Sequence, residues 1–296
     1  MKTVMITSFT DPLCTWCWGE EPVFRKIETH FGDQVNFRFI MGGLVEDFGA
    51  SGWPWNAPGR GGIPEGNKVI GKHWEDASSR HGMPTVGEKM DLFDEEYRSS
   101  FPQNIAVKGA EIIDPDKAPV FLHRLREASS AEGLKTSRED VLISLASAVG
   151  LDTAAFIGAL RDGSAQKAFE QDRGYAQSLG ITGFPTCIVQ YGDKSVLLNG
   201  YNNYETFVAV IERISDGKIK PLETSFNGET ILDLLKKYGR LAPEEIRQAF
   251  DFPDRNALEA WLEKMSVAGK VRRIRMGNGE TIEAVGQTCV NGSCAI

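Results

Sequence analysis

The chain has 296 residues, of which 41% are hydrophobic and 25% are charged, a composition typical of globular proteins. This composition excludes a fibrous or wholly disordered chain, and the length predicts about two domains. The 33 Lys and Arg residues against 41 Asp and Glu residues give a net charge of −8. A field of that sign makes a nucleic acid or an anionic membrane surface an unfavourable partner.

No segment predicts insertion into a membrane. The longest uncharged apolar stretch, residues 141–151, is too short to cross a bilayer. The first nine residues lack the apolar segment and the cleavage site of a signal peptide. We therefore expect a cytoplasmic protein with no membrane partner.

The first 43 residues predict a β-α-β unit. Residues 3–9 are rich in β-branched and aromatic side chains, which favours a strand. Residues 14–31 carry apolar side chains at three- and four-residue spacing, which predicts a helix with one apolar face, and residues 35–41 predict a second strand. The Gly-, Pro- and Trp-rich run at 42–66 predicts a long loop.

The middle of the chain predicts a helical insertion within an α/β fold. From about 68 to 180 the periodicity is helical, with Gly and Pro interruptions that divide it into about five helices. Strands are expected at 186–189 and 195–198, followed by a helix at 204–214. The predicted order is therefore β-α-β, helical insertion, β-β-α.

After a linker at 216–226, a compact C-terminal domain is expected. Residues 226–285 predict three short helices, then two strands flanking Gly277-Asn278-Gly279. Three helices and a hairpin resemble a winged helix. This segment holds ten Lys and Arg against ten Asp and Glu, so nucleic acid is an unlikely partner. We expect the segment to dock a protein, to form a dimer such as a homodimer, or to support the tail.

Two of the five cysteines form a Cys14-Thr15-Trp16-Cys17 motif where the first strand passes into a helix. The amino end of a helix stabilises a thiolate. The pattern predicts Cys14 as a redox nucleophile with a lowered pKa and Cys17, one turn on, as the resolving thiol. Half of a zinc site and two unrelated cysteines remain the alternatives.

Three stretches together resemble the DsbA-like thioredoxin-fold proteins, in particular their FrnE-type cytoplasmic branch, over roughly residues 3–215. They are Asp11-Pro12-Leu13-Cys14-Thr15-Trp16-Cys17-Trp18-Gly19, the helical insertion, and Leu179-Gly180-Ile181-Thr182-Gly183-Phe184-Pro185-Thr186. The resemblance implies a thioredoxin domain at 1–217 with Cys14 as the attacking thiol. It also implies a cis Pro185 that aligns the substrate backbone, and Pro22 stands where thioredoxins kink their first helix.

The resemblance further implies the chemistry. We expect a protein disulfide oxidoreductase or isomerase that needs no cofactor or metal. Its catalytic residues would be Cys14, Cys17 and Pro185, and its partners protein or small-molecule disulfides and a thiol reductant. Trp16, Phe184 and Thr186 are the expected substrate contacts. Thr15 and Phe184 depart from the residues common in relatives, so neither redox potential nor substrate pocket carries over.

The tail at 286–296 is too short and polar to form its own core. Val290-Asn291-Gly292-Ser293 predicts a two-residue hairpin, which places Cys289 opposite Cys294 at a spacing that suits a disulfide. We expect this redox-active pair to relay electrons to the first pair. Two unpaired thiols or a metal clip are the alternatives.

A reading from a different class competes with the enzyme. The same residues suit a redox-sensing or zinc-binding adaptor that binds protein partners without catalytic turnover. Turnover of a disulfide substrate separates the two hypotheses.

Overall fold

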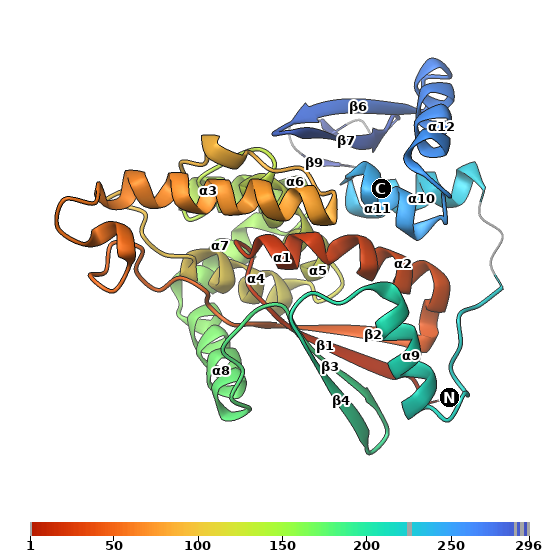
Figure 1. The fold of residues 1–296 in the computed structure, drawn as a ribbon, viewed down its shortest axis with the longest axis horizontal. Helices are drawn as coiled ribbons and strands as arrows, with labels where there is room; N and C mark the ends of the chain where they lie inside the picture. Colours follow the sequence, from red (N-terminus) through yellow and green to blue (C-terminus); the bar gives the residue numbers. More distant parts are fainter. Residues whose placement is uncertain (1, 224–226, 287–288, 291–292, 295–296) are drawn as a thin grey trace.

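The computed structural model describes residues 2–223 and 227–286, together with the backbone of 289–290 and 293–294. A four-stranded sheet lies at its centre (Figure 1), in the order β2-β1-β3-β4. Its strands are β1 (Val4–Thr10), β2 (Val35–Met41), β3 (Thr186–Tyr191) and β4 (Lys194–Asn199). β1 runs parallel to β2 and antiparallel to β3, and β3 runs antiparallel to β4.

The helix expected at 14–31 is broken in two. It forms α1 (Thr15–Gly19) and α2 (Glu21–Phe31), followed by the 3-10 turn η1 (Gly32–Gln34). Pro22 occupies the first turn of α2, where its missing N–H is tolerated although it could not continue a preceding helix. The break turns Glu20 and Glu21 into the protein interior, where both are almost fully buried.

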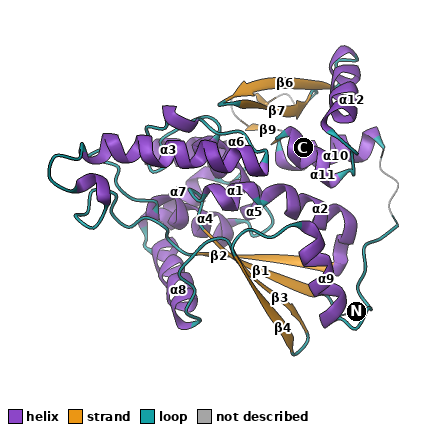
Figure 2. Cartoon of the chain, viewed as in Figure 1, coloured by secondary structure: helices purple, strands orange, loops and turns teal. Residues whose placement is uncertain are grey.

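Helices cover both faces of the sheet (Figure 2). α2 and α9 (Tyr204–Ile214) pack on one face around a core that includes Ile6, Phe24 and Phe207. α8 (Ser164–Ser178) packs on the other, where Phe9 and Ile40 meet Ala176. Each face therefore has its own apolar core, and β1 is enclosed between them.

The helical insertion lies between β2 and β3 and begins at Gly62, earlier than residue 68. A buried core centred on Met41, Phe121 and Phe156 holds it together. Its elements, after the 3-10 turn η2 (Pro54–Asn56), are α3 (Gly62–His81), the 3-10 turn η3 (Gly87–Lys89), α4 (Phe101–Ile113), α5 (Ala118–Ser130), α6 (Glu139–Ala148), α7 (Thr153–Arg161) and α8. None of the described helices is long and apolar enough to span a bilayer.

The C-terminal elements follow the expected order of three helices and a hairpin. They are α10 (Gly228–Tyr238), β5 (Arg240–Leu241), α11 (Pro243–Ala249), α12 (Arg255–Val267), β6 (Val271–Met276) and β7 (Gly279–Ala284). β5, β7 and β6 form a small antiparallel sheet in that order. That this unit is a winged-helix domain stays a prediction.

The tip of the β6–β7 hairpin is fixed to the thioredoxin-like part of the chain. The N–H of Asn278 donates to the Thr85 carbonyl, and the Asn278 side-chain oxygen accepts from the Thr85 N–H, each at 2.9 Å. The Asn278 amide also donates to the Ser78 hydroxyl at 3.1 Å. Three hydrogen bonds at one residue therefore hold the hairpin against the end of α3.

We predict that Gly277→Ala loosens this hairpin. A Cβ at Gly277 would lie 2.2 Å from the Thr85 carbonyl oxygen, and the residue has φ +50. Gly269→Ala is the control, because Gly269 has φ +65 but open space around a Cβ. Chemical unfolding should show a loss of about 1 kcal/mol for the control, from backbone strain alone, and a clearly larger loss for Gly277→Ala. Equal losses would contradict the tight contact.

Candidate functional site

The cysteine pair lies at the start of α1, next to the end of the central strand β1. Cys14 caps the helix, and the Cys17 N–H donates to the Cys14 Sγ at 3.2 Å. Both thiols are free in this structure and buried, with 5% of Cys14 and 1% of Cys17 exposed. The pair is thus placed as expected in the fold but is nearly closed to solvent.

The structure brings Pro185 to the same place. The Phe184–Pro185 peptide bond is cis, as predicted. The Cys14 thiol donates to the Phe184 carbonyl at 3.5 Å, which joins the cysteine pair to the cis peptide bond. The ring of Phe184 rests on Gly42, where an added Cβ would come within 1.9 Å of it.

The three expected substrate contacts differ in what they reach. Trp16 is half-buried and its ring meets those of His81 and Tyr201 at 5.8 and 6.0 Å between centroids. Phe184 packs into the apolar core beneath the sheet. Thr186 is buried and donates its hydroxyl to the Gly183 carbonyl at 2.8 Å. Of the three, only Trp16 lies at a rim formed by other side chains of the site.

The negative charge of the pair is stabilised at Cys17, not at Cys14 as expected from the helix end. Burial raises the pKa of the Cys14 thiol well above its usual range. Burial acts the same way on Cys17, but hydrogen bonds from Cys14 and Thr10 and the charge of Arg126 outweigh it and lower the pKa of Cys17. A five-residue helix gives little dipole, whereas a buried guanidinium acts through a medium of low dielectric.

A buried acid and a third thiol lie behind the pair. Glu20 is fully buried, and its Oε2 is 3.8 Å from the Cys187 Sγ while its Oε1 has no hydrogen-bond partner. Burial, followed by the charge of Cys17, raises the pKa of Glu20 well above its usual range. Burial also raises the pKa of Cys187. Burial therefore favours the protonated form of Glu20, and Cys187 lies in the core as a buried thiol.

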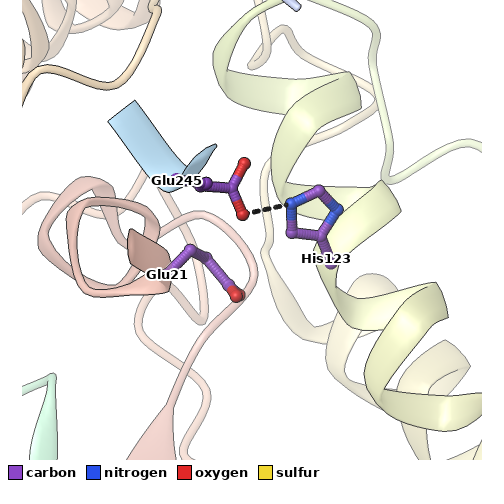
Figure 3. Close-up of side chains that lie close together, drawn as sticks. All are labelled: Glu21, His123 and Glu245. Carbon is purple, nitrogen blue, oxygen red and sulfur yellow. Dashed lines mark hydrogen bonds and ion pairs between the residues drawn. The ribbon is translucent and has the colours of Figure 1, made fainter. Parts of the chain in front are cut away.

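A buried ion network leads from Cys17 to the C-terminal elements. Figure 3 shows three of its members, Glu21, His123 and Glu245. Arg126 on α5 contacts Glu21 on α2, and Arg25 meets the same carboxylate at 2.9 Å. His123, one turn before Arg126, meets Glu245 on α11 at 2.9 Å. Burial alone would lower the pKa of His123, but the Glu245 charge and hydrogen bond raise it.

Three of these residues could in principle bind a metal ion. The ligand atoms of Glu21, His123 and Glu245 lie within 4.8 Å of one another. The guanidinium groups of Arg25 and Arg126 already balance the two carboxylates, so a divalent cation would add uncompensated positive charge. Among the residues that the structure describes, Cys14 and Cys17 belong to no comparable group.

The tail is described only through its backbone. β8 (Cys289–Val290) pairs antiparallel with β9 (Ser293–Cys294), and Cys289 lies opposite Cys294. This register is the predicted one. The side chains of both cysteines lie outside the described residues, so the predicted dithiol itself is untested.

The similarity of this chain to known proteins covers far more than the cysteine motif. A family model described as "Thioredoxin" matches residues 8–209. A "ClpXP adapter protein SpxH" from Halalkalibacterium halodurans is 27% identical over 282 residues, covering 94% of this chain and 88% of that protein. A protein of the same name from Shouchella clausii is 28% identical over 278 residues, covering 92% and 86%.

Solved structures match the fold. A "putative protein disulfide isomerase" from Nitrosomonas europaea superposes with a TM-score of 0.61 at 20% identity, covering 73% of this chain and 100% of that one. A "probable DsbA oxidoreductase" from Streptomyces coelicolor gives 0.56 at 18% identity, covering 75% and 94%. The predicted DsbA-like thioredoxin fold with a helical insertion is thereby confirmed.

The predicted activity is wrong. We expected a protein disulfide oxidoreductase or isomerase with a C-terminal dithiol relay, but the relatives that match nearly the whole chain are named adapter proteins. The disulfide-enzyme names belong to structures at 18% and 20% identity, which share the fold. The closed Cys14 thiol with its raised pKa gives a physical reason why this pair would be a poor nucleophile.

Sequence reasoning missed the buried charges. Glu20, Glu21, Arg126, His123 and Glu245 were not identified, because charged residues are normally exposed and their pairing depends on partners far apart in the chain. Arg126 and Glu21 are 105 positions apart. The one signal available was the Glu20-Glu21-Pro22 run directly after the cysteine helix.

We predict that Arg126→Met lowers the free energy of unfolding by about 3–5 kcal/mol, because it leaves Glu21 partly uncompensated in the interior. It should also raise the pKa of Cys17, which thiolate absorbance during a pH titration would report. Arg126→Lys keeps the charge and should lose less of both. Arg161→Met removes an exposed pair with Glu139 and should cost no more than about 1 kcal/mol.

We predict that Glu20→Gln changes how stability depends on pH. The native state holds the Glu20 proton, whereas the unfolded chain releases it near pH 4.3. Stability from this group is therefore full below that pH and declines as pH rises through the native pKa, by about 1.4 kcal/mol per unit. Urea unfolding at pH 4.5 and 8 should show the variant gaining relative stability at pH 8. If the relative unfolding free energy of Glu20→Gln changed between pH 4.5 and 8 no more than that of the exposed control Glu263→Gln, the raised pKa of Glu20 would be contradicted.

Proposed function

This chain belongs to the thioredoxin family, and from that premise we propose that it works in the cytoplasm as an adaptor that binds a partner protein for ClpXP. The observation that carries the proposal is the extent of the match to adapter proteins. The two relatives cover 94% and 92% of this chain, so the similarity includes the C-terminal elements as well as the thioredoxin part. A shared fold alone would leave those elements unmatched.

The geometry of the cysteine pair supports an adaptor over an enzyme. An attacking thiol needs access and a thiolate, and Cys14 is 5% exposed with a pKa raised by burial. The Phe184 carbonyl is already bonded to Cys14. The pair is better suited to report a slow redox change than to turn over disulfides.

We assign the pair the role of a sensor. Exchange with an outside disulfide, such as oxidised glutathione, would form a Cys14–Cys17 bond and release two reduced thiols; a thiol reductant would reverse it. Oxidation takes away the Cys17 thiol whose ionised form Arg126 favours, and the carboxylate paired with Arg126 is that of Glu21. Because Glu21 lies next to the His123–Glu245 pair, the change reaches the contact that holds α11.

Residues 226–285 serve in this proposal as a winged-helix-like docking domain attached to the thioredoxin domain at 1–217. The segment is neutral, and the tip of its hairpin is bonded to Thr85 and Ser78. A hairpin held in this way is not free to enter a DNA groove. We keep the tail at 286–296 as a second cysteine pair, Cys289 and Cys294, of unassigned role.

The test is degradation of a purified partner by purified ClpXP, the partner being first identified by cross-linking to this chain. Adding the reduced chain should speed degradation at least fivefold. Cys14→Ser/Cys17→Ser should retain this effect, because binding needs no turnover. Oxidised glutathione should change the wild-type Kd for the partner and leave the double variant unaffected. An inactive double variant, together with steady insulin reduction by the wild type, would contradict the proposal.

A further inference from the structure

Figure 1 shows α3 next to the C-terminal elements, above the sheet. Polar cavities lie where these elements meet. Three cavities of about 390, 910 and 600 Å³ succeed one another there. The first and second share Arg255, and the second and third share Arg275. The hairpin tip, where Asn278 is hydrogen-bonded to Thr85 and Ser78, lies between the second and third cavities. We call the three cavities together the seam.

The walls of the seam are fixed before any partner binds. On one side lies the end of α3 with Ser78 and Ser79, and on the other the hairpin with Asn278. Asn278 joins the two sides through its hydrogen bonds to Ser78 and Thr85. A preformed cleft binds an extended segment without the entropy loss of ordering its own walls.

Some charged side chains of the seam form ion pairs and others do not. Arg273 is held by Glu259 and Glu280, and Arg247 by Glu244. In the part of the chain that the structure describes, four exposed cations lining the seam form no ion pair, namely Arg80, Lys89, Arg255 and Arg275.

Two acids in the seam are also without an ion pair among the described residues. Glu75 is exposed, and Asp254 is the N-cap of α12, accepting from the Ala257 N–H at 2.8 Å. Across the three cavities the lining carries seven Lys and Arg against six Asp and Glu, so the seam is slightly positive although the chain as a whole carries −8. Both Arg255 and Arg275 line the largest of the three cavities.

We propose that the seam binds an acidic, extended segment of the partner protein, with Arg255 and Arg275 as its main charged contacts. This inference rests on the proposed adaptor function and names the chemistry that the partner must present. Carboxylates along an extended chain would meet free guanidinium groups at successive positions of the seam. The surrounding negative field would repel acidic proteins that cannot reach these groups, which favours specificity.

A protein segment fits better than a nucleic acid. A phosphate backbone carries a charge at every nucleotide, so it could not avoid the free acids Glu75 and Asp254. A peptide can place neutral residues against those acids. The seam also ends at His81 and Tyr201, whose rings contact Trp16 of the cysteine motif. A bound segment would therefore run toward the redox pair.

The test uses the full chain and a fluorescein-labelled twelve-residue peptide of alternating Asp, Glu and Leu, read by fluorescence anisotropy. Arg255→Glu/Arg275→Glu should weaken binding at least tenfold at low salt. Lys167→Glu/Lys218→Glu is the matched control, because it makes the same change in net charge at exposed residues outside the seam. The control should weaken binding less than threefold. A lysine-rich peptide of equal length should not bind.

Three results would overturn the inference: equal weakening by both double variants, tighter binding of a single-stranded oligonucleotide than of the acidic peptide, or binding that neither variant changes. Circular dichroism and thermal melting of both variants check that they fold. The ClpXP assay separates the two proposals. If the wild type and Arg255→Glu/Arg275→Glu speed degradation equally, the proposed peptide site is wrong but the adaptor function is supported. If the wild type has no effect on degradation, the adaptor function is wrong, and the peptide-binding assay alone decides whether the seam binds acidic segments.

Discussion

The buried guanidinium of Arg126 is the interaction on which most of this structure depends. It contacts Glu21 and Thr10, and its charge lowers the pKa of Cys17. Without it, only Arg25 would remain to balance the buried Glu21 carboxylate, a loss that would cost about 3–5 kcal/mol. The same carboxylate lies beside the His123–Glu245 pair, so one cation links the cysteine helix, the insertion and the C-terminal elements.

Much of the fold could be predicted because it depends on local patterns. Short runs rich in β-branched and aromatic residues identified the strands of the four-stranded sheet, and Gly277-Asn278 marked the turn between β6 and β7. The break between α1 and α2 was expected only as a kink at Pro22. The early start of α3 at Gly62 was missed because residues 42–66 are rich in Gly and Pro, which normally indicate a loop.

The site was predictable in position but not in chemistry. The motif located Cys14, Cys17 and the cis Pro185 correctly relative to the sheet. Its reactivity depends on burial and on Arg126, more than a hundred residues away, and neither is encoded locally. The family resemblance therefore transferred the fold faithfully and the activity wrongly, since a thioredoxin fold carries many functions and the site decides among them.

The contacts of Glu245 and Asn278 also make the thioredoxin part and the C-terminal elements depend on each other. Glu245 is fully buried against His123, which lies on α5 of the insertion, and Asn278 is bonded to Thr85 and Ser78. If the two parts were separated, these polar groups would lose their hydrogen-bond partners on both sides. Each part therefore depends on the other to satisfy its buried polar groups. Either part on its own would have to open these groups to water or leave them unpaired.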